Sequence, residues 1–349
     1  MSSRVLVTAA GSIVAQGIIK SLKLANRKNN NYMIIAADMS PLAAGLYRCD
    51  RGILVPPASS PAYIDSIIKA CQDNDVQAIF CGSDKELLTL ASAKDRIEDK
   101  TGAKLLTGSL EALAIARDKW STFEFCKTND LQCAPSSLPE ESDEFVREFG
   151  FPVVVKPREG YGSFHFYIAK NKDEMENAVS AIKNTGWRPI IQKYLADDNE
   201  FTTGVTIDKN AKYVMSSISI RKIIKHGQTY KAFIDDFHAI RKSAEEVALK
   251  LGACGPVNVQ AKLEADSPMV FEINPRFSAT CPMRAAAGVN EPDMVFQNMV
   301  LGQEVKVDRY ERMVCMRYWN EVYVPYSHYE KASGDGQIET NSSFVPDYF

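Results

Sequence analysis

The first third of the chain alternates short β-branched runs with helical segments, and this alternation restricts the folds available to it. The runs RVLVTAA, MIIAADM and AIFCGSD have the composition of strands. Between them, residues 13–24 and the stretch IDSIIKACQ space their apolar side chains as helices do. Strands separated by helices of roughly a dozen residues form parallel βαβ units. The sequence therefore predicts an open, doubly wound, Rossmann-like α/β domain.

Beyond residue 110 the pattern changes from α/β to α+β. Residues 107–130 are expected to be helical, and the apolar run FPVVVKP predicts a strand that ends at its second proline. A polar helix over 173–184 and several strands follow. The stretches GPVNVQAKL and PMVFEINP are typical of two paired antiparallel strands, so a second fold type begins near residue 110.

Composition limits the partners that this chain can bind. With 349 residues, 45% hydrophobic and 24% charged, it resembles an average globular protein of two or three domains. The net charge is -3, and the sequence has no dense Lys/Arg runs of the kind that bind nucleic acid. Small molecules are therefore the expected partners. Eight scattered cysteines without a CxxC pair indicate reduced thiols. No apolar stretch approaches a membrane span and the start has no secretory pattern, so we expect a cytoplasmic protein without membrane contact.

The glycines near the start give a weak nucleotide signal. Gly11 and Gly17 follow a strand and open a helix, but the central glycine of the dinucleotide fingerprint GxGxxG is missing. Asp38 ends the second strand, where a ribose-binding acid would lie. An ordinary strand-to-helix turn is favoured over NAD binding.

The stretch CGSDKELL ends another parallel strand, and ligands of open α/β sheets bind at the carboxyl ends of strands. Asp84 and Glu86 are therefore candidate substrate contacts. The alternative, equally weighted, is that Ser83 or Asp84 simply caps the following helix.

Two lysines and a short loop indicate phosphate binding. Lys119 lies in the helical segment and Lys156 on an apolar strand, where an ammonium group is costly unless an anion pairs with it. The loop with Gly160, Gly162 and Ser163 can present backbone N–H groups to phosphate oxygens. The Walker A pattern is missing from the sequence. The alternatives to phosphate binding are a surface lysine and an ordinary hairpin turn, which would have the same sequence.

The stretch IIQKYLADDNEF suits a hinge that holds a nucleoside. The backbone of Gln192, Lys193 and Leu195 could meet an adenine edge, and Glu200 could hold ribose hydroxyls. An ordinary strand followed by an acidic loop is the alternative.

The stretch FEINPRFSAT places three polar side chains on one strand face. Glu272, Asn274 and Arg276 alternate with apolar residues, so they share a face. With Gln260 from the preceding strand, they would offer the oxygen ligands that Mg²⁺ prefers. Arg276 could stabilise phosphoryl oxygens. A structural carboxylate–arginine pair is the alternative.

In their order along the chain, Lys119, VVVKP, the glycine loop, QKYL with Glu200, NVQ and FEINPR resemble the ATP-grasp superfamily. The resemblance is to its carbamoyl-phosphate-synthase-like branch, which includes carboxylate–amine ligases such as the pyrrolysine-pathway ligase. It covers most of residues 1–305, and NVQ with FEINPRFSAT is its most specific part.

The resemblance implies a pre-ATP-grasp domain and an ATP-grasp fold, and phosphorylation of a carboxylate by ATP followed by attack of an amine. Carbamoyl-phosphate-type chemistry and a non-catalytic ATP-binding module are the alternatives.

The resemblance also implies ATP and Mg²⁺ as cofactors, with Mn²⁺ as a substitute, and allows a homodimer. The implied divisions are a pre-ATP-grasp domain (1–110), a lid with the glycine loop (111–190), a lobe with the metal site (191–305) and a small extension (306–349). The implied roles are ATP binding by Lys119, Lys156, Gly160, Gly162, Ser163, Gln192, Lys193, Leu195 and Glu200, metal binding by Gln260, Glu272 and Asn274, and catalysis by Arg276.

The sequence departs from the superfamily pattern at three points. Gln260 stands where many relatives have glutamate, Gln192 replaces the usual hinge glutamate, and the lid loop has few glycines and several bulky residues. Substrate contacts are expected, as a class, from polar residues that face the cleft in such folds. These are Arg221, Lys231, Ser278 and Arg284, of which Arg284 would suit a substrate carboxylate or equally a structural ion pair.

Overall fold

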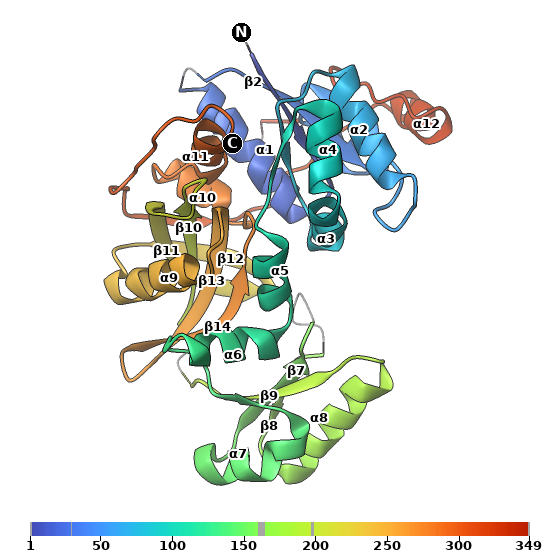
Figure 1. Cartoon of the computed structure of the whole chain (residues 1–349). Helices are drawn as coiled ribbons and strands as arrows, with labels where there is room; N and C mark the ends of the chain where they lie inside the picture. The colour runs from blue at the N-terminus through green and yellow to red at the C-terminus, as the bar shows by residue number, and fades with distance from the viewer. Residues whose placement is uncertain (1, 29, 160–164, 197–198, 348–349) are drawn as a thin grey trace.

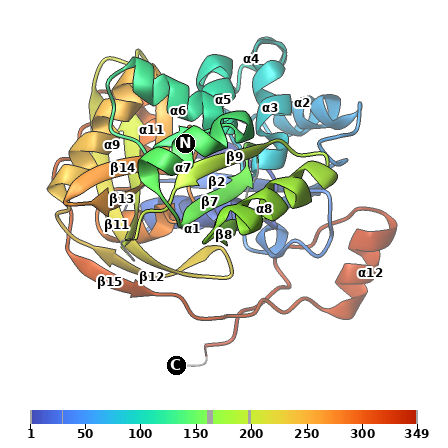
Figure 2. The same cartoon turned by 90° about the horizontal axis from the view of Figure 1, so that it is seen from below.

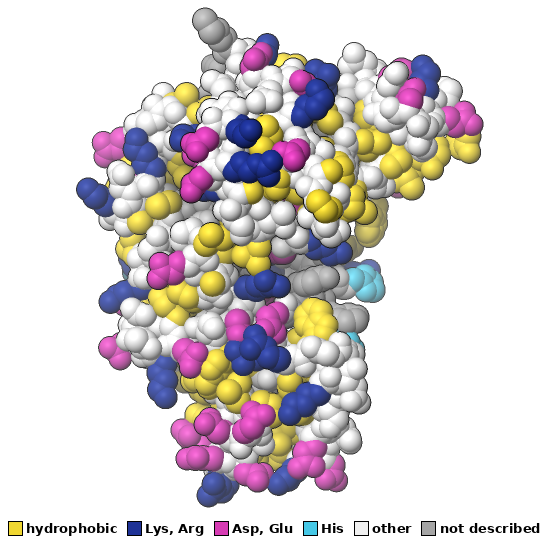
Figure 3. Space-filling view, turned by 45° about the vertical axis from the view of Figure 1, so that its right-hand side comes forward, with side chains coloured by type: hydrophobic (Ala, Val, Ile, Leu, Met, Phe, Trp, Pro, Cys, Tyr) yellow, Lys and Arg dark blue, Asp and Glu magenta, His cyan; other side chains and the backbone are white. Residues whose placement is uncertain are grey.

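Three sheets follow one another along the chain in the computed structural model, which describes residues 2–28, 30–159, 165–196 and 199–347. In Figure 1 the N-terminal sheet lies at the top, the six-stranded third sheet in the middle and the four-stranded second sheet at the bottom. Acidic and basic side chains are interspersed over the face that Figure 3 displays. None of the described helices is long and apolar enough to cross a membrane.

The N-terminal region is a five-stranded parallel sheet in the order β3-β2-β1-β4-β5, with apolar cores on both faces. This confirms the predicted doubly wound fold, because each buried β-branched run lies between helices that cover it. The bounds are β1 (Ser3–Val7), α1 (Ile13–Asn26), β2 (Tyr32–Asp38), η1 (Ala44–Tyr47), β3 (Arg51–Leu54), α2 (Tyr63–Asp73), β4 (Ala78–Phe80), α3 (Asp84–Ser92), α4 (Lys94–Thr101) and β5 (Lys104–Leu106).

The helical segment predicted over 107–130 is two helices that meet at Asp118. The Asp118 side chain accepts a hydrogen bond from the Trp120 amide at 2.9 Å, which caps the second helix. It also pairs with Arg158, just after β7, and so fixes this helix to the next sheet. The helices are α5 (Leu110–Arg117) and α6 (Lys119–Thr128).

A four-stranded antiparallel sheet in the order β6-β9-β7-β8 forms the lowest region of Figure 1, with two helices against it. The predicted strand FPVVVKP and the predicted polar helix are both present. The bounds are β6 (Ser136–Ser137), η2 (Pro139–Glu141), α7 (Ser142–Phe149), β7 (Val153–Pro157), β8 (Tyr167–Ala169), α8 (Lys172–Asn184) and β9 (Pro189–Lys193). The loop with Gly160, Gly162 and Ser163 lies outside the described residues.

The third sheet has six antiparallel strands in the order β14-β13-β10-β11-β12-β15. Helix α9 packs on its apolar face, while α10 and α11 contact α1 and join the core of the N-terminal sheet. The predicted hairpin of GPVNVQAKL and PMVFEINP is the β13–β14 pair. The bounds are β10 (Glu200–Ile207), β11 (Val214–Lys225), β12 (Gln228–Ile234), α9 (His238–Lys250), β13 (Gly255–Glu264), β14 (Ser267–Asn274), α10 (Cys281–Ala286), α11 (Glu291–Met299) and β15 (Met313–Met316).

The C-terminal segment returns to the N-terminal sheet. After β15 pairs with β12, the chain runs along the outside of the molecule to α12 (Tyr326–Gly334), a helix that the sequence did not predict (Figure 2). The Ser343 hydroxyl donates to the Tyr47 carbonyl at 2.7 Å, and the Thr340 hydroxyl to the Asp50 carbonyl at 3.3 Å. The domain boundaries at 110, 190 and 305 stay predictions.

Candidate active site

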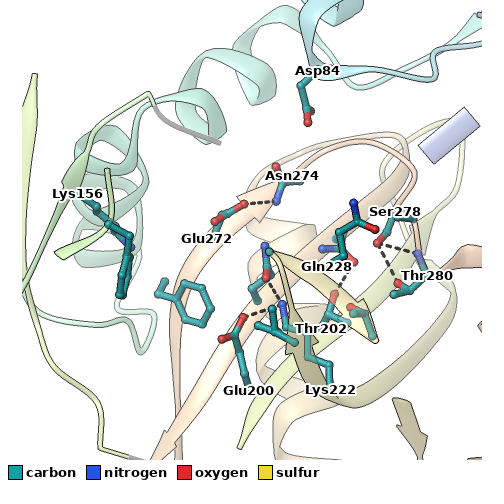
Figure 4. Close-up of a pocket in the computed structure, with 18 of the residues that line it drawn as sticks. Asp84, Lys156, Glu200, Thr202, Lys222, Gln228, Glu272, Asn274, Ser278 and Thr280 are labelled. Atoms are coloured by element: carbon teal, nitrogen blue, oxygen red, sulfur yellow. Dashed lines mark hydrogen bonds and ion pairs between the residues drawn. The ribbon is translucent and has the colours of Figure 1, made fainter. Parts of the chain in front are cut away.

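A cavity of about 640 Å³ lies between the three sheets. Its walls come from the carboxyl end of β4 in the N-terminal sheet, from β7 and β9, and from one face of the six-stranded sheet (Figure 4). A volume of this size holds a small ligand or a nucleotide. Twelve sequence candidates line it: Asp84, Lys119, Lys156, Gln192, Lys193, Leu195, Glu200, Gln260, Glu272, Asn274, Arg276 and Ser278.

Strand register builds the polar face of the cavity. Glu200 lies opposite Lys222 on β11, and Gln260 lies opposite Glu272 on β14. The Lys222 ammonium is 2.7 Å from a carboxylate oxygen of Glu200 and 2.5 Å from the Gln260 carbonyl oxygen. This lysine therefore links the expected ribose contact to an expected metal ligand, and the sequence analysis missed it.

Its neighbour Arg221, the predicted substrate contact, points to the opposite face of β11. Its guanidinium lies 4.1 Å from the centre of the Phe233 ring and outside the cavity. Side chains alternate along a strand, so an error of one position changes the face. The signal that could have found Lys222 is its charge, which is opposite to that of its partner Glu200.

The alternation read in FEINPR brings its three polar groups together as predicted. The Asn274 amide donates to Glu272 at 2.9 Å, and Arg276 donates to the Asn274 carbonyl oxygen at 3.3 Å. Arg276 also binds Asp84 through two nitrogens, at 2.5 and 3.0 Å, and so joins the six-stranded sheet to the N-terminal one. Ser83 caps α3, which was one of the two equally weighted readings, and Ser83 and Asp84 also line the cavity, so this turn provides both a cap and a cavity wall.

Electrostatics hold Glu272 ionised. Burial raises the pKa of its carboxyl, but Lys119, the hydrogen bond from Asn274, and the ammonium groups of Lys156 and Lys222 together lower it below its ordinary value. The ionised form is the one that binds a cation.

The three expected metal ligands, Gln260, Glu272 and Asn274, fit Mg²⁺ only together with other oxygen ligands. The described residues hold no cluster of three or more His, Cys, Asp or Glu side chains that could bind a metal ion. Glu272 would provide one carboxylate, and Gln260 and Asn274 two amide oxygens. Because Mg²⁺ retains waters and takes further ligands from phosphates, this set suits a nucleotide-bound ion.

Lys156 is buried beside an uncharged amide and a second lysine, with the carboxylates of Glu272 and Glu200 near enough to act on its charge. Its side chain is 7% exposed and donates to the Gln192 amide oxygen at 2.8 Å. Burial, and then the charge of Lys119, lowers its pKa from 10.5 to about 7. The carboxylates of Glu272 and Glu200 offset only part of this effect, so an anionic ligand would stabilise the charged form further.

Several other sequence candidates lie elsewhere. The Glu86 carboxylate is buried in the N-terminal domain, where the Tyr63 hydroxyl donates to it at 2.5 Å and the Gly82 amide at 3.1 Å. Lys231 is exposed on β12 and does not line the cavity. The proposed substrate contacts Glu86, Arg221 and Lys231 are corrected accordingly.

Arg284 forms the structural ion pair that was its alternative reading. The side chain is fully buried, 3.1 Å from Glu291, and it donates to the Asn258 amide oxygen at 2.8 Å. Asn258 and Thr202, which this network holds in place, do line the cavity. Arg284 therefore supports the wall from behind and cannot reach a substrate.

The turn with Gly11 has a structural explanation. Asp38 accepts a hydrogen bond from the Gly11 amide at 2.8 Å, and Ser12 caps α1 through the Ala15 amide at 2.9 Å. The favoured reading of this segment, an ordinary strand-to-helix turn, agrees with these contacts.

Comparisons with known proteins agree with this architecture. Residues 5–106 match the family described as "PylC-like, N-terminal domain", and residues 188–322 match "ATP-grasp in the biosynthetic pathway with Ter operon". The carbamoyl phosphate synthase large chain of Helicobacter pylori is 25% identical over 244 residues, which are 65% of this chain and 22% of the relative. That of Pyrococcus furiosus is 24% identical over 275 residues, 74% of this chain and 26% of the relative. The chain thus spans about a quarter of the length of these relatives.

Solved structures share the fold. N5-carboxyaminoimidazole synthetase from Staphylococcus aureus, complexed with ADP, has a TM-score of 0.70 and 16% identity, over 90% of this chain and 82% of that one. The biotin carboxylase domain of Hydrogenobacter thermophilus 2-oxoglutarate carboxylase, with MgADP and bicarbonate, has a TM-score of 0.67 and 18% identity, over 88% and 72%.

The sheets, the cavity and these matches define an ATP-grasp protein. Within that superfamily, residues 5–106 are similar to the PylC-like N-terminal domain, and the chain resembles part of the carbamoyl phosphate synthase large chain.

Proposed function

We propose that this chain is an ATP- and Mg²⁺-dependent ligase that activates a small carboxylate, such as that of an amino acid, as an acyl phosphate and joins it to an amine. The observation that carries the proposal is the arrangement of three groups in one cavity: the buried Lys156, the ionised Glu272 and the guanidinium of Arg276. Each matches a separate requirement of phosphoryl transfer to an acid.

The reaction has two steps in which atoms and charge balance. A carboxylate oxygen attacks the γ-phosphorus of ATP, the bond to the β,γ-bridging oxygen breaks, and ADP leaves. The amine then attacks the acyl carbon, inorganic phosphate leaves, and the amine nitrogen loses a proton to solvent or base.

This chain's residues would hold the reactants and compensate charge. Lys156 and Lys119 would contact the phosphates, and Lys193 and Leu195 would border the adenine. Glu200 would accept hydrogen bonds from the ribose.

At the reacting end, Glu272, Asn274 and Gln260 would hold Mg²⁺, which neutralises phosphate charge when it is bound. Arg276, anchored by Asp84, would stabilise the negative charge on the acyl phosphate and on its tetrahedral successor. Its two bonds to Asp84 limit its freedom, so it is oriented before substrate arrives.

A substrate screen tests the proposal. Purified protein with ATP and Mg²⁺ is offered pools of amino acids and other small acids with amines, and ADP, phosphate and condensed products are measured by mass spectrometry. We expect ADP release that depends on the pool and an equal amount of a condensed product. ATP binding without turnover for any pool would favour the alternative of a binding module.

A further inference from the structure

One cationic group of the cavity has no role in the reaction described above. Arg317 follows β15 in the C-terminal segment, and its side chain lines the cavity beside Ser278, Ala279 and Thr280. Its guanidinium donates to the Ala279 carbonyl at 2.6 Å, and its backbone amide donates to the Tyr230 carbonyl at 3.0 Å. Both contacts hold the guanidinium at the cavity wall.

The charge of Arg317 is not balanced by a carboxylate among the described residues. In the same cavity Arg276 pairs with Asp84, and Lys222 pairs with Glu200. Arg317 forms no such ion pair within the described parts of the chain. Burial lowers its pKa, against a smaller opposite effect of two cysteine thiols.

A second cation adds to this excess of positive charge. Lys20 on α1 lies close enough that the charge of Arg317, after partial burial, lowers the pKa of its ammonium group. Two cations that disfavour each other would gain from an anion placed between or beside them.

The position of Arg317 relates this charge to the reacting centre. Arg276 donates to the Phe277 carbonyl at 3.0 Å, and Arg317 donates to the Ala279 carbonyl two residues further along the same loop. The Ser278 and Thr280 hydroxyls, 2.9 Å apart, line the cavity beside them (Figure 4). An anionic group at Arg317 would therefore lie only a few bonds from a carboxylate that is activated at Arg276.

We propose that Arg317 is a specificity-determining residue that binds a second, non-reacting carboxylate of the substrate. The substrate of this site would thus be a small molecule with a free carboxylate in addition to its reacting group. The inference rests on the proposed ligase function and narrows its substrate class.

The first test measures binding without turnover. The melting temperature of the full chain, loaded with Mg–ADP, is measured with aspartate, with glutamate and with the dicarboxylates from malonate to adipate, and again with the monoamides of each acid, which keep one carboxylate. We expect at least one acid to raise the melting temperature more than its amide does. Arg317→Gln should abolish this difference. Arg312→Gln should preserve it, because Arg312 is exposed and pairs with Asp235 on the surface.

The second test uses turnover. For the substrate found, Arg317→Gln should raise KM by about 10- to 100-fold, as expected for loss of a hydrogen bond to a charged group, with little change in kcat and in the KM for ATP. Arg317→Lys should recover part of the loss, since it restores the charge without the planar fork.

The outcomes separate the two proposals. If Mg–ADP does not bind to the wild-type chain, the proposed function fails. If Mg–ADP binds but no acid stabilises the wild type more than its amide does, or Arg317→Gln retains the preference, the assignment of Arg317 is wrong.

Discussion

Lys156 should couple nucleotide binding to uptake of a proton. In the ligand-free protein its pKa is about 7, because the ammonium group is buried beside Gln192 and Lys119. At pH 8 about nine tenths of this side chain would therefore be neutral. Phosphate oxygens favour the charged form, so binding should draw in about 0.9 proton at pH 8 and about 0.1 at pH 6. Affinity should fall about tenfold per pH unit above pH 7.

The stability of the ligand-free protein should change in the opposite direction. The pKa of Lys156 is 10.5 in the unfolded chain and about 7 in the folded one, so the unfolded state binds more protons between these values. The cost of burying the charge, roughly 1.4 kcal/mol per pKa unit, is fully present below pH 7 and declines as the pH rises toward 10.5.

Isothermal titration calorimetry measures the coupling directly. A non-hydrolysable ATP analogue with Mg²⁺ is titrated at pH 6 and pH 8, each in two buffers with different ionisation enthalpies. Lys156→Arg should bind without proton uptake, because arginine stays charged. Lys170→Met, an exposed control beside β8, should behave as wild type. Equal uptake by wild type and Lys156→Arg at pH 8, or none by the wild type, would refute the reasoning.

Two further substitutions test the metal site and its support. Glu272→Gln should reduce turnover by at least about 100-fold while circular dichroism and melting temperature stay close to wild type, because it removes the one carboxylate among the expected cation ligands; normal turnover would show that the metal assignment is wrong. Gly204→Ala should destabilise the protein by about 3 kcal/mol in urea unfolding, because a Cβ there would overlap the buried pair of Arg284 and Glu291. Gly334→Ala, where a Cβ meets nothing within 4 Å, is the matched control, and equal stability of the two variants would contradict the packing.

Local patterns predicted the parts of the fold that depend on local physics. The alternation of β-branched runs and helices predicted the parallel sheet, and the period of two in FEIN placed Glu272 and Asn274 on one face of β14. Arg276 lies two residues beyond the end of that strand, yet it lines the same cavity. In both cases the information lies within a few residues of the chain.

Pairing between distant strands could not be read in the same way. The choice between Arg221 and Lys222 depends on the register of β11 against β10, and β11 is irregular further on, between Ile223 and Ile224. Glu86 carries the same charge as Asp84 two positions earlier, yet helix geometry turns it into the core.

Contacts made by the C-terminal segment were also beyond the sequence. Arg317 reaches the cavity only because β15 pairs with β12. The four residues of β15 carry no sequence pattern that predicts this pairing. The helix α12 was missed as well, because the C-terminal extension was expected to contain strands and a loose end.

Oxygen transfer from the substrate carboxylate to phosphate tests the central claim most directly. The acid identified in the screen is labelled with ¹⁸O in its carboxylate and turned over with unlabelled ATP in unlabelled water. Formation of an acyl phosphate moves one carboxylate oxygen into the phosphate that the amine displaces. We predict one ¹⁸O atom in inorganic phosphate for each amide bond formed. Inorganic phosphate free of ¹⁸O, with amide product present, would contradict activation of the carboxylate by phosphorylation.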